Sequence, residues 1–291
     1  MSKREVLRIK IYDVEHGDCI LIQFPNGEIG LVDSNLPSGR NPSPALKDII
    51  EQGGKLKFIC LTHPHHDHFA GLMSILESEK VTVGEFWHSM SFGLESILKF
   101  YNERSIMQNS SEVEFITKKR LIDSKNGELL DIFDHLAQKG INYHKNIREF
   151  QILSPIGGVN ILALSPSNRA CNKYEKLLSE ALKDAPSEEI IKHTRDYANR
   201  ISIVLLLKFD ESEVLLGGDA LKQNWKEIIK GLDKINRKKL AANCIKVSHH
   251  ASKDSFEENM WSTLLKENSS AIVSCGLPHH PSTQFIYNLN P

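Results

Sequence analysis

The chain has 291 residues, and its 36 lysines and arginines against 37 aspartates and glutamates give a formal net charge of −1. With 40% hydrophobic and 25% charged residues, the composition is that of a globular protein and excludes a disordered, collagenous or coiled-coil chain. The neutral balance also excludes a surface that is basic overall, so any nucleic-acid contact would need a local patch.

The predicted elements alternate between strands and helices. In the first half, strands are predicted at 5–12, 19–24, 29–32 and 57–61, and helices at 45–52 and 69–76. Residues 85–150 are more polar and mostly helical in pattern, for example at 94–104 and 128–139. In the second half, strands are predicted at 159–164, 201–209, 213–216, 244–248 and 271–275, and helices at 172–198, 221–231 and 256–266. This order predicts a layered α/β sandwich, formed by one domain over 1–291 with helical insertions at about 85–150 and 172–198.

The start of the chain and the cysteines indicate the compartment. Residues 1–5 are mostly polar or charged and lack the apolar core of a signal peptide. The longest apolar run, at 203–207, is far shorter than a membrane span. Five scattered cysteines without CxxC spacing indicate free thiols. We therefore expect a cytoplasmic protein with no membrane contact.

The most specific motif is His63-x-His65-x-Asp67-His68, directly after the predicted strand 57–61. Composition alone would produce this pattern in roughly one such chain in a thousand. Two histidines two residues apart in an extended segment point to the same side and can chelate one ion. Asp67 and His68, at the start of the next helix, can reach a second ion. Nitrogen and carboxylate ligands without nearby cysteines suit Zn²⁺, with Mn²⁺ as the alternative.

Two further segments offer ligands for a pair of ions. Asp219 follows the strand 213–216 and two glycines, which allow close backbone approach, so it is suited to bridge two ions. Taken alone, Asp219 could equally be the N-cap of the helix that follows. His249 and His250 end another predicted strand and offer one more ligand. The sequence does not decide which of these two histidines it is.

The HxHxDH motif resembles the signature of metallo-β-lactamase-fold hydrolases. Six segments, in order, are similar to the ComEC-type (DNA-uptake-like) subgroup and its soluble, free-standing relatives: Val14–Ile22, Leu31–Ser34, Asn199–Leu205, Leu215–Asp219, Lys246–Ser252 and Gly276–Pro281. The resemblance implies a four-layer αβ/βα sandwich that binds two divalent ions. Members that act on lactams, thioesters or tRNA ends carry another histidine where this chain has Ala198. Ala251 also replaces a glycine of the subgroup.

The resemblance also implies a reaction and roles for residues. It implies a phosphodiesterase or nuclease in which a hydroxide activated by two metal ions attacks DNA or RNA. The implied metal ligands are His63, His65, Asp67, His68, Asp219 and His249. The implied catalytic groups are Asp67, His250 and His280, the last two for proton transfer or phosphate contact. Asp33 would orient a ligand histidine. Asp18, Asn199 and Ser202 are the other implied supporting or substrate-contacting residues.

Other functions stay open from the sequence. A small-molecule phosphoester hydrolase, similar to choline-phosphate esterases, is the close alternative. A thioesterase or lactonase is disfavoured by the absent histidine, and a non-catalytic binding module by the full ligand set. Lys222, Lys226, Lys230 and Lys234 form a stripe that is either a solvated helix face or a contact for a phosphate backbone. Relatives that act beside other proteins in defence systems suggest a protein partner, and the chain could be a fragment of a longer protein.

Overall fold

The computed structural model describes residues 5–37, 41–90, 126–144, 147–181, 187–274 and 280–283. The first of two six-stranded sheets has its strands in chain order. They are β1 (Arg8–Ile11), β2 (Cys19–Gln23), β3 (Ile29–Ser34), β4 (Lys55–Leu61), β5 (Thr82–His88) and β6 (Asn142–His144). Strands β1 to β3 are antiparallel, and β3 to β6 run parallel.

The second sheet has the strand order β12-β11-β10-β9-β8-β7. Its strands are β7 (Gln151–Ile156), β8 (Val159–Ser165), β9 (Val204–Phe209), β10 (Ser212–Leu216), β11 (Ala242–Lys246) and β12 (Leu265–Ile272). Strands β7 to β10 are antiparallel, and β10 to β12 run parallel. Each sheet therefore combines an antiparallel part with a parallel part.

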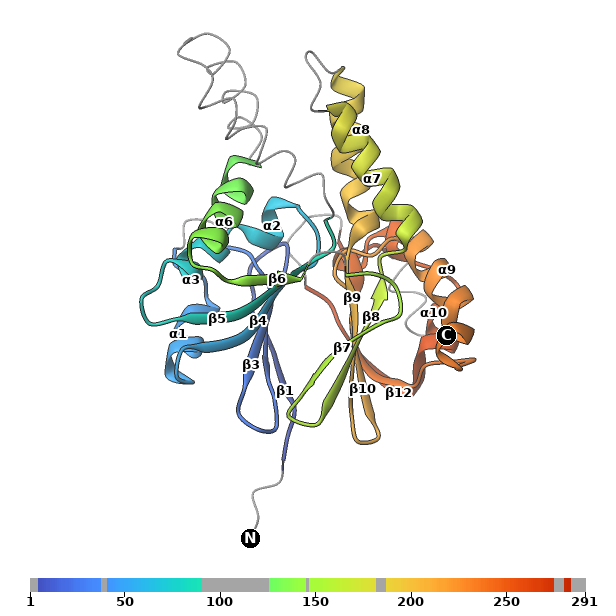
Figure 1. Cartoon of the computed structure of the whole chain (residues 1–291). Helices are drawn as coiled ribbons and strands as arrows, with labels where there is room; N and C mark the ends of the chain where they lie inside the picture. The colour runs from blue at the N-terminus through green and yellow to red at the C-terminus, as the bar shows by residue number, and fades with distance from the viewer. Residues whose placement is uncertain are drawn as a thin grey trace.

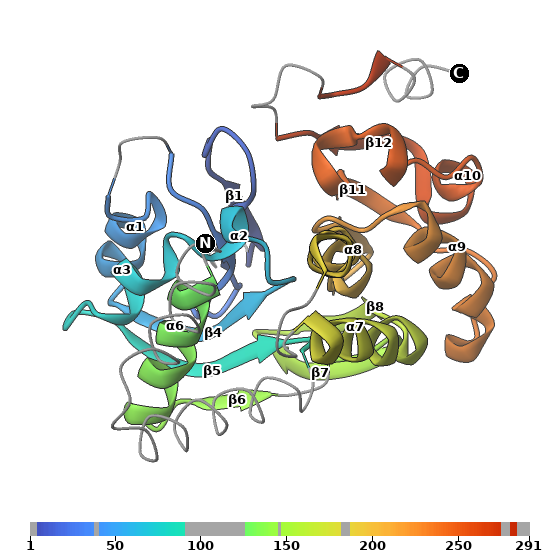
Figure 2. The same cartoon turned by 90° about the horizontal axis from the view of Figure 1, so that it is seen from above.

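Helices cover the outer face of each sheet (Figures 1 and 2). The α-helices are α1 (Ala45–Glu51), α2 (His66–Phe69), α3 (Leu72–Leu76), α6 (Asn126–Gln138), α7 (Asn168–Ala181), α8 (Glu188–Tyr197), α9 (Lys222–Gly231) and α10 (Met260–Leu264). Short 3-10 turns are η1 (Ala198–Ile201), η2 (Leu232–Ile235), η3 (Ser248–Ala251) and η4 (Lys253–Ser255). Among the described residues, no helix is both long enough and apolar enough to cross a bilayer.

Strand β2 shows why the sheets pack in four layers. Successive side chains of a strand point to opposite faces, and both faces of β2 are apolar. Leu21 joins the core between the first sheet and its helices, whereas Ile20 and Ile22 join the core between the two sheets. A third core, which contains Trp225 of α9 and Ile245 of β11, lies between the second sheet and its helices. The predicted four-layer αβ/βα sandwich is confirmed.

Several predicted boundaries differ from the structure. The mostly helical prediction for 85–150 is wrong at β5 and β6, while α6 agrees with the helix predicted at 128–139. In β5 only the last three residues are buried, so the strand lacks the alternation that reveals a half-buried strand. Strand β7 was not predicted, and the helix predicted at 256–266 is only α10, followed at once by β12. The helix predicted at 94–104 lies outside the described residues.

Candidate metal centre

The predicted ligands meet at one end of the sandwich, where strands of both sheets finish. His63 and His65 follow β4, and His68 lies in α2, which Figure 1 shows at the upper end of the first sheet. Asp219 follows β10 through two glycines, and His249 lies in η3 after β11. In α/β sheets, ligands bind at the carboxyl ends of the strands. The arrangement therefore places residues from both sheets around one site.

Asp219 lies at the centre of this cluster. Its Oδ2 is 3.4 Å from His68 Nε2, 3.8 Å from His63 Nε2 and 3.9 Å from His249 Nε2. His65 Nδ1 is 3.0 Å from His63 Nε2. Asp67 joins at the edge, with its Oδ2 3.9 Å from His68 Nε2. The carboxylate thus faces three imidazole nitrogens, and His63, His68 and Asp219 form a group that could hold a metal ion.

Four histidines of the cluster, His63, His65, His68 and His249, are each oriented by a hydrogen bond at the ring nitrogen that points away from the cluster. The contacts are His63 Nδ1 with Thr62 Oγ1 at 3.1 Å, His65 Nε2 with the Arg195 carbonyl oxygen at 2.9 Å, His68 Nδ1 with Asp33 Oδ2 at 2.6 Å, and His249 Nδ1 with Ser252 Oγ at 2.9 Å. Metal-binding histidines typically have their second nitrogen fixed in this way. The protein therefore holds four imidazoles with the other nitrogen turned toward the cluster.

Buried atoms in the cluster indicate that the residues fit a cation. The side chains of His63 and His68 are fully buried, and that of Asp219 is 4% exposed. Within the described part of the chain, His68 Nε2 and Asp219 Oδ1 are buried without a hydrogen-bond partner. A buried polar atom left unpaired costs about 1–3 kcal/mol. A bound metal ion would supply the missing interactions.

The protonation of the cluster also suits cation binding. Burial and the neighbouring histidines lower the pKa of His63 well below its usual range, so its nitrogen is neutral. Burial would raise the pKa of Asp219, but the facing His68 lowers it well below its usual range, so the group is a carboxylate. Burial lowers the pKa of His68, but Asp219 and Asp33 raise it well above its usual value. A cation bound to His68 would therefore replace a proton.

Asp33 and Ser202 support the cluster from behind. Asp33 is fully buried, accepts hydrogen bonds from the backbone and hydroxyl of Thr62 at 2.7 Å each, and contacts His68 as described above. Burial raises the pKa of Asp33, and the His68 charge opposes that rise. Ser202 Oγ accepts the backbone N–H of Asp219 at 2.9 Å. The geometry thus places Asp33 behind a ligand histidine and Ser202 behind the central carboxylate.

His249 and His250 point in different directions. The Nε2 of His250 accepts the backbone N–H of Gly17 at 3.2 Å, and its Nδ1 lies 3.1 Å from the Ser274 carbonyl oxygen. Both nitrogens of His250 are therefore engaged away from Asp219, whereas His249 Nε2 faces it. The turn that separates them has positive φ at His249, His250 and Ala251 (47°, 52° and 58°). Glycine adopts such angles without strain, which explains why a glycine would suit position 251.

Asp18 and His280 lie at the border of the cluster. Both carboxylate oxygens of Asp18 contact Lys246 Nζ, at 2.5 and 2.6 Å, and each of the two residues is 1% exposed. Asp18 is thus held in a buried ion pair. The His280 ring centroid lies 6.1 Å from that of His249 and 6.4 Å from that of His250. His280 therefore stands beside the histidine pair.

Sequence reasoning missed several residues that hold the candidate ligands or the residues beside them. Lys246 and Ser252 flank the two histidines in a segment that carried a family signal, but their contacts depend on the fold. Arg195 contributes only its carbonyl oxygen, so its side chain gave no signal. A Cβ on Gly17 would lie 1.8 Å from the Asp67 carbonyl oxygen, and Gly17 has a φ of +76°. The need for glycine at position 17 becomes visible only from the packing of this segment against the one that contains Asp67.

The lysine stripe on α9 and η2 is partly neutralised. Lys222 and Lys226 lie 3.9 and 3.8 Å from Glu257, and Lys234 lies 3.4 Å from Glu149. Surface ion pairs of this kind are weak, but they reduce the positive charge that the stripe presents. The stripe therefore offers less attraction for a phosphate backbone than its sequence indicates.

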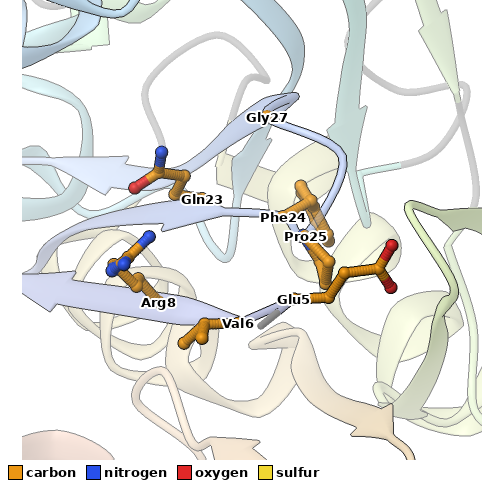
Figure 3. A pocket seen from close by; sticks show the side chains of 7 residues that line it. All are labelled: Glu5, Val6, Arg8, Gln23, Phe24, Pro25 and Gly27. Carbon is orange, nitrogen blue, oxygen red and sulfur yellow. The ribbon is translucent and has the colours of Figure 1, made fainter. Parts of the chain in front are cut away.

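A separate pocket lies near the hairpin that joins β2 and β3 (Figure 3). It is lined by Glu5, Val6, Arg8, Gln23, Phe24, Pro25 and Gly27. This hairpin is at the opposite end of β2 and β3 from the metal-ligand cluster. The lining includes no histidine or cysteine, so the pocket is not a second candidate centre.

One family model and several solved structures are similar to this chain. Residues 12–140, under half of the chain, match the model of the Metallo-beta-lactamase superfamily. No curated protein matches the sequence. Among solved structures, the chain is similar to CmlA, a diiron beta-hydroxylase from Streptomyces venezuelae, at 14% identity and a TM-score of 0.39, over 84% of this chain and 35% of that one.

Two further solved structures are similar at the same level. Zn²⁺-bound PqqB from Methylobacterium extorquens has 11% identity and a TM-score of 0.37, over 78% of this chain and 58% of that one. YhfI from Bacillus subtilis, a metallo-beta-lactamase fold protein, has 11% identity and a TM-score of 0.37, over 86% and 70%. The chain spans less than two thirds of the length of CmlA and of PqqB. The two mixed sheets between helical layers, with residues 12–140 matching the superfamily, show that the chain has the metallo-β-lactamase fold.

Proposed function

We propose that this chain is a metal-dependent hydrolase that cleaves phosphodiesters, with DNA or RNA as the substrate class. One observation carries the proposal. Four histidines have their outward nitrogens hydrogen-bonded to other groups of the protein, and their inward nitrogens lie near Asp219. This arrangement is typical of histidines that bind a metal ion. When two divalent ions are bound there, they supply a water of lowered pKa and positive charge for phosphoryl oxygens. Zn²⁺ suits these donors, with Mn²⁺ as the alternative.

Different residues would bind each of the two ions. His63 and His65 would hold one ion, while Asp67, His68 and His249 would hold the other, and Asp219 lies between the two groups. The side chains of Asp67 and His249 are 29% and 26% exposed, whereas those of His63, His68 and Asp219 are buried. Substrate would therefore approach from the side of Asp67 and His249. His280 lies on this side, next to His249, and is suited to contact phosphate or to protonate a leaving group.

The position of the absent histidine supports a phosphodiester substrate. Ala198 stands there, 2% exposed, and its side chain has no atom that could bind a metal. The ion at His63 and His65 would then have fewer protein ligands and more room for substrate oxygens. This openness suits a phosphoryl group, whose charged oxygens bind divalent cations directly.

A small-molecule phosphoester hydrolase is the second candidate. The observation that favours it is the pairing of three stripe lysines with Glu257 and Glu149. A polymer-cutting enzyme needs a basic path for several phosphates, whereas a small substrate needs only the metal centre.

A panel of substrates tests both candidates. The protein, loaded with Zn²⁺ or Mn²⁺, is incubated with single- and double-stranded DNA, with RNA and with bis(p-nitrophenyl) phosphate. We expect cleavage of a polymer, reduced at least about 100-fold in Asp219→Asn because the central ligand is lost. His193→Ala, on the exposed face of α8, is the matched control and should retain full activity. Turnover of the small ester alone would favour the second candidate, and full activity in Asp219→Asn would overturn the metal-dependent reaction.

A further inference from the structure

The Asn199 side chain is a buried polar group at the cluster for which the resemblance implies only a general supporting or substrate-contacting role. Asn199 lies in η1, directly after α8, and is 7% exposed. Its Nδ2 is 3.4 Å from His249 Nε2, the nitrogen that faces Asp219. Its Oδ1 is buried, and among the described residues it has no hydrogen-bond partner. The amide therefore brings a second unpaired oxygen, besides Asp219 Oδ1, to this side of the cluster.

The surroundings of Asn199 indicate what this oxygen lacks. A side-chain amide offers one acceptor oxygen and two donor hydrogens, and a buried amide oxygen is normally paired. The outward Nδ1 of His249 is already held by Ser252 at 2.9 Å, so only its inward nitrogen remains beside the amide. A half-turn of the amide about its last side-chain bond would exchange Nδ2 and Oδ1 and bring the carbonyl oxygen beside His249 Nε2, the nitrogen that faces Asp219. Oxygen, imidazole and carboxylate donors together suit a divalent cation.

We propose that Asn199 Oδ1 is an additional ligand of the metal centre, on the side formed by His249 and Asp219. The proposal rests on the metal centre proposed above and adds to it a neutral oxygen ligand close to the place where related enzymes have a histidine. Oxygen ligands favour Mn²⁺ relative to Zn²⁺, whereas imidazole favours Zn²⁺. Asn199 would thus reduce the preference of the centre for Zn²⁺.

Metal binding measured without substrate tests this role. Mn²⁺ and Zn²⁺ affinities are determined by titration calorimetry, and the number of bound ions by mass spectrometry of dialysed protein. For Asn199→Ala we expect Mn²⁺ affinity to fall about 10- to 100-fold. Asn199→Asp should bind Mn²⁺ more tightly than the unmodified protein, because it adds a negative charge to the same oxygen position. Asn199→His should raise Zn²⁺ affinity relative to Mn²⁺.

The opposite directions of these changes separate a ligand from a merely structural residue, since misfolding would weaken binding in all three variants. Asn160→Ala, at an exposed position near the far end of β8, is the control and should bind both metals normally. Cobalt-substituted protein should change its visible spectrum in the Asn199 variants alone. Unchanged affinities and spectrum in Asn199→Ala, even with a raised KM, would overturn the proposal and leave the metal centre standing. Absence of metal binding in the unmodified protein would overturn both.

Discussion

Replacing Lys246 by methionine should destabilise the protein strongly, because it leaves the buried carboxylate of Asp18 without its partner. The two charges are 2.5 Å apart, and each residue is 1% exposed. At an effective dielectric constant of about 20, two charges at that distance attract each other by roughly 6–7 kcal/mol. Their desolvation offsets part of this attraction, so the expected loss in the free energy of unfolding is about 3–5 kcal/mol.

Urea unfolding followed by tryptophan fluorescence measures this loss, since Trp87 and Trp225 are buried reporters in different layers. A chelator in the buffer removes any contribution from bound metal. The double variant Asp18→Leu with Lys246→Met should recover much of the loss, because no isolated charge remains. Lys222→Met, whose side chain is 47% exposed beside Glu257, should change stability by less than about 1 kcal/mol. A loss below about 1 kcal/mol in Lys246→Met, or additive losses in the double variant, would refute the reasoning.

Two further predictions concern backbone packing and pH. Gly17→Ala should lower both thermal stability and metal affinity, because the new Cβ would lie 1.8 Å from the Asp67 carbonyl oxygen. Gly27→Ala is the control, because Gly27 has a similar positive φ but no neighbour within 4 Å. Equal effects of the two substitutions in thermal melts with and without Mn²⁺ would contradict this prediction. Burial raises the pKa of Glu213, but the two contacts with Arg237, at 2.6 and 3.1 Å, bring it below its usual value. The folded pKa is thus below the unfolded one, so the carboxylate stabilises the fold above pH of about 4.5 and loses this effect as the pH falls through the folded pKa. The stability difference between the unmodified protein and Glu213→Gln should therefore disappear on acidification in urea unfolding at several pH values, and a constant difference down to about pH 3 would contradict the assignment.

The layered fold could be predicted because local patterns and the fold agree over most of the chain. Strands β2 and β9 are mostly apolar, with one polar or charged residue each, so the sequence predicted both as strands. Strand β5 was not predicted, because its first four residues are exposed or half-buried and only its last three are buried. This pattern results from its place in the parallel part of the sheet. Strand β12 was predicted only at its end, by the strand expected at 271–275, because most of its residues are exposed and lack the apolar signal on which a strand prediction depends.

The candidate site could be predicted in part for a similar reason. The HxHxDH segment is continuous, so its spacing together with the family resemblance was enough to name candidate ligands there. The choice between His249 and His250 could not be predicted, because both residues follow the same strand. Three successive residues with positive φ turn the His249 ring toward Asp219 and the His250 ring toward Gly17. The outward partners of the histidines come from distant segments, such as the end of α8 for His65, and no local pattern encodes them.

Because the two sheets contribute different candidate ligands, the proposed metal centre can be completed only after both sheets have been synthesised. His63 and His68 leave the ribosome well before Asp219 and His249, by roughly 10–40 s between His68 and His249 at about 5–20 residues per second. During that interval the growing chain carries a chelating segment without its central carboxylate. Tight binding at the proposed centre would therefore require that the second sheet has folded against the first, and the number of ions bound would report whether the two sheets have docked.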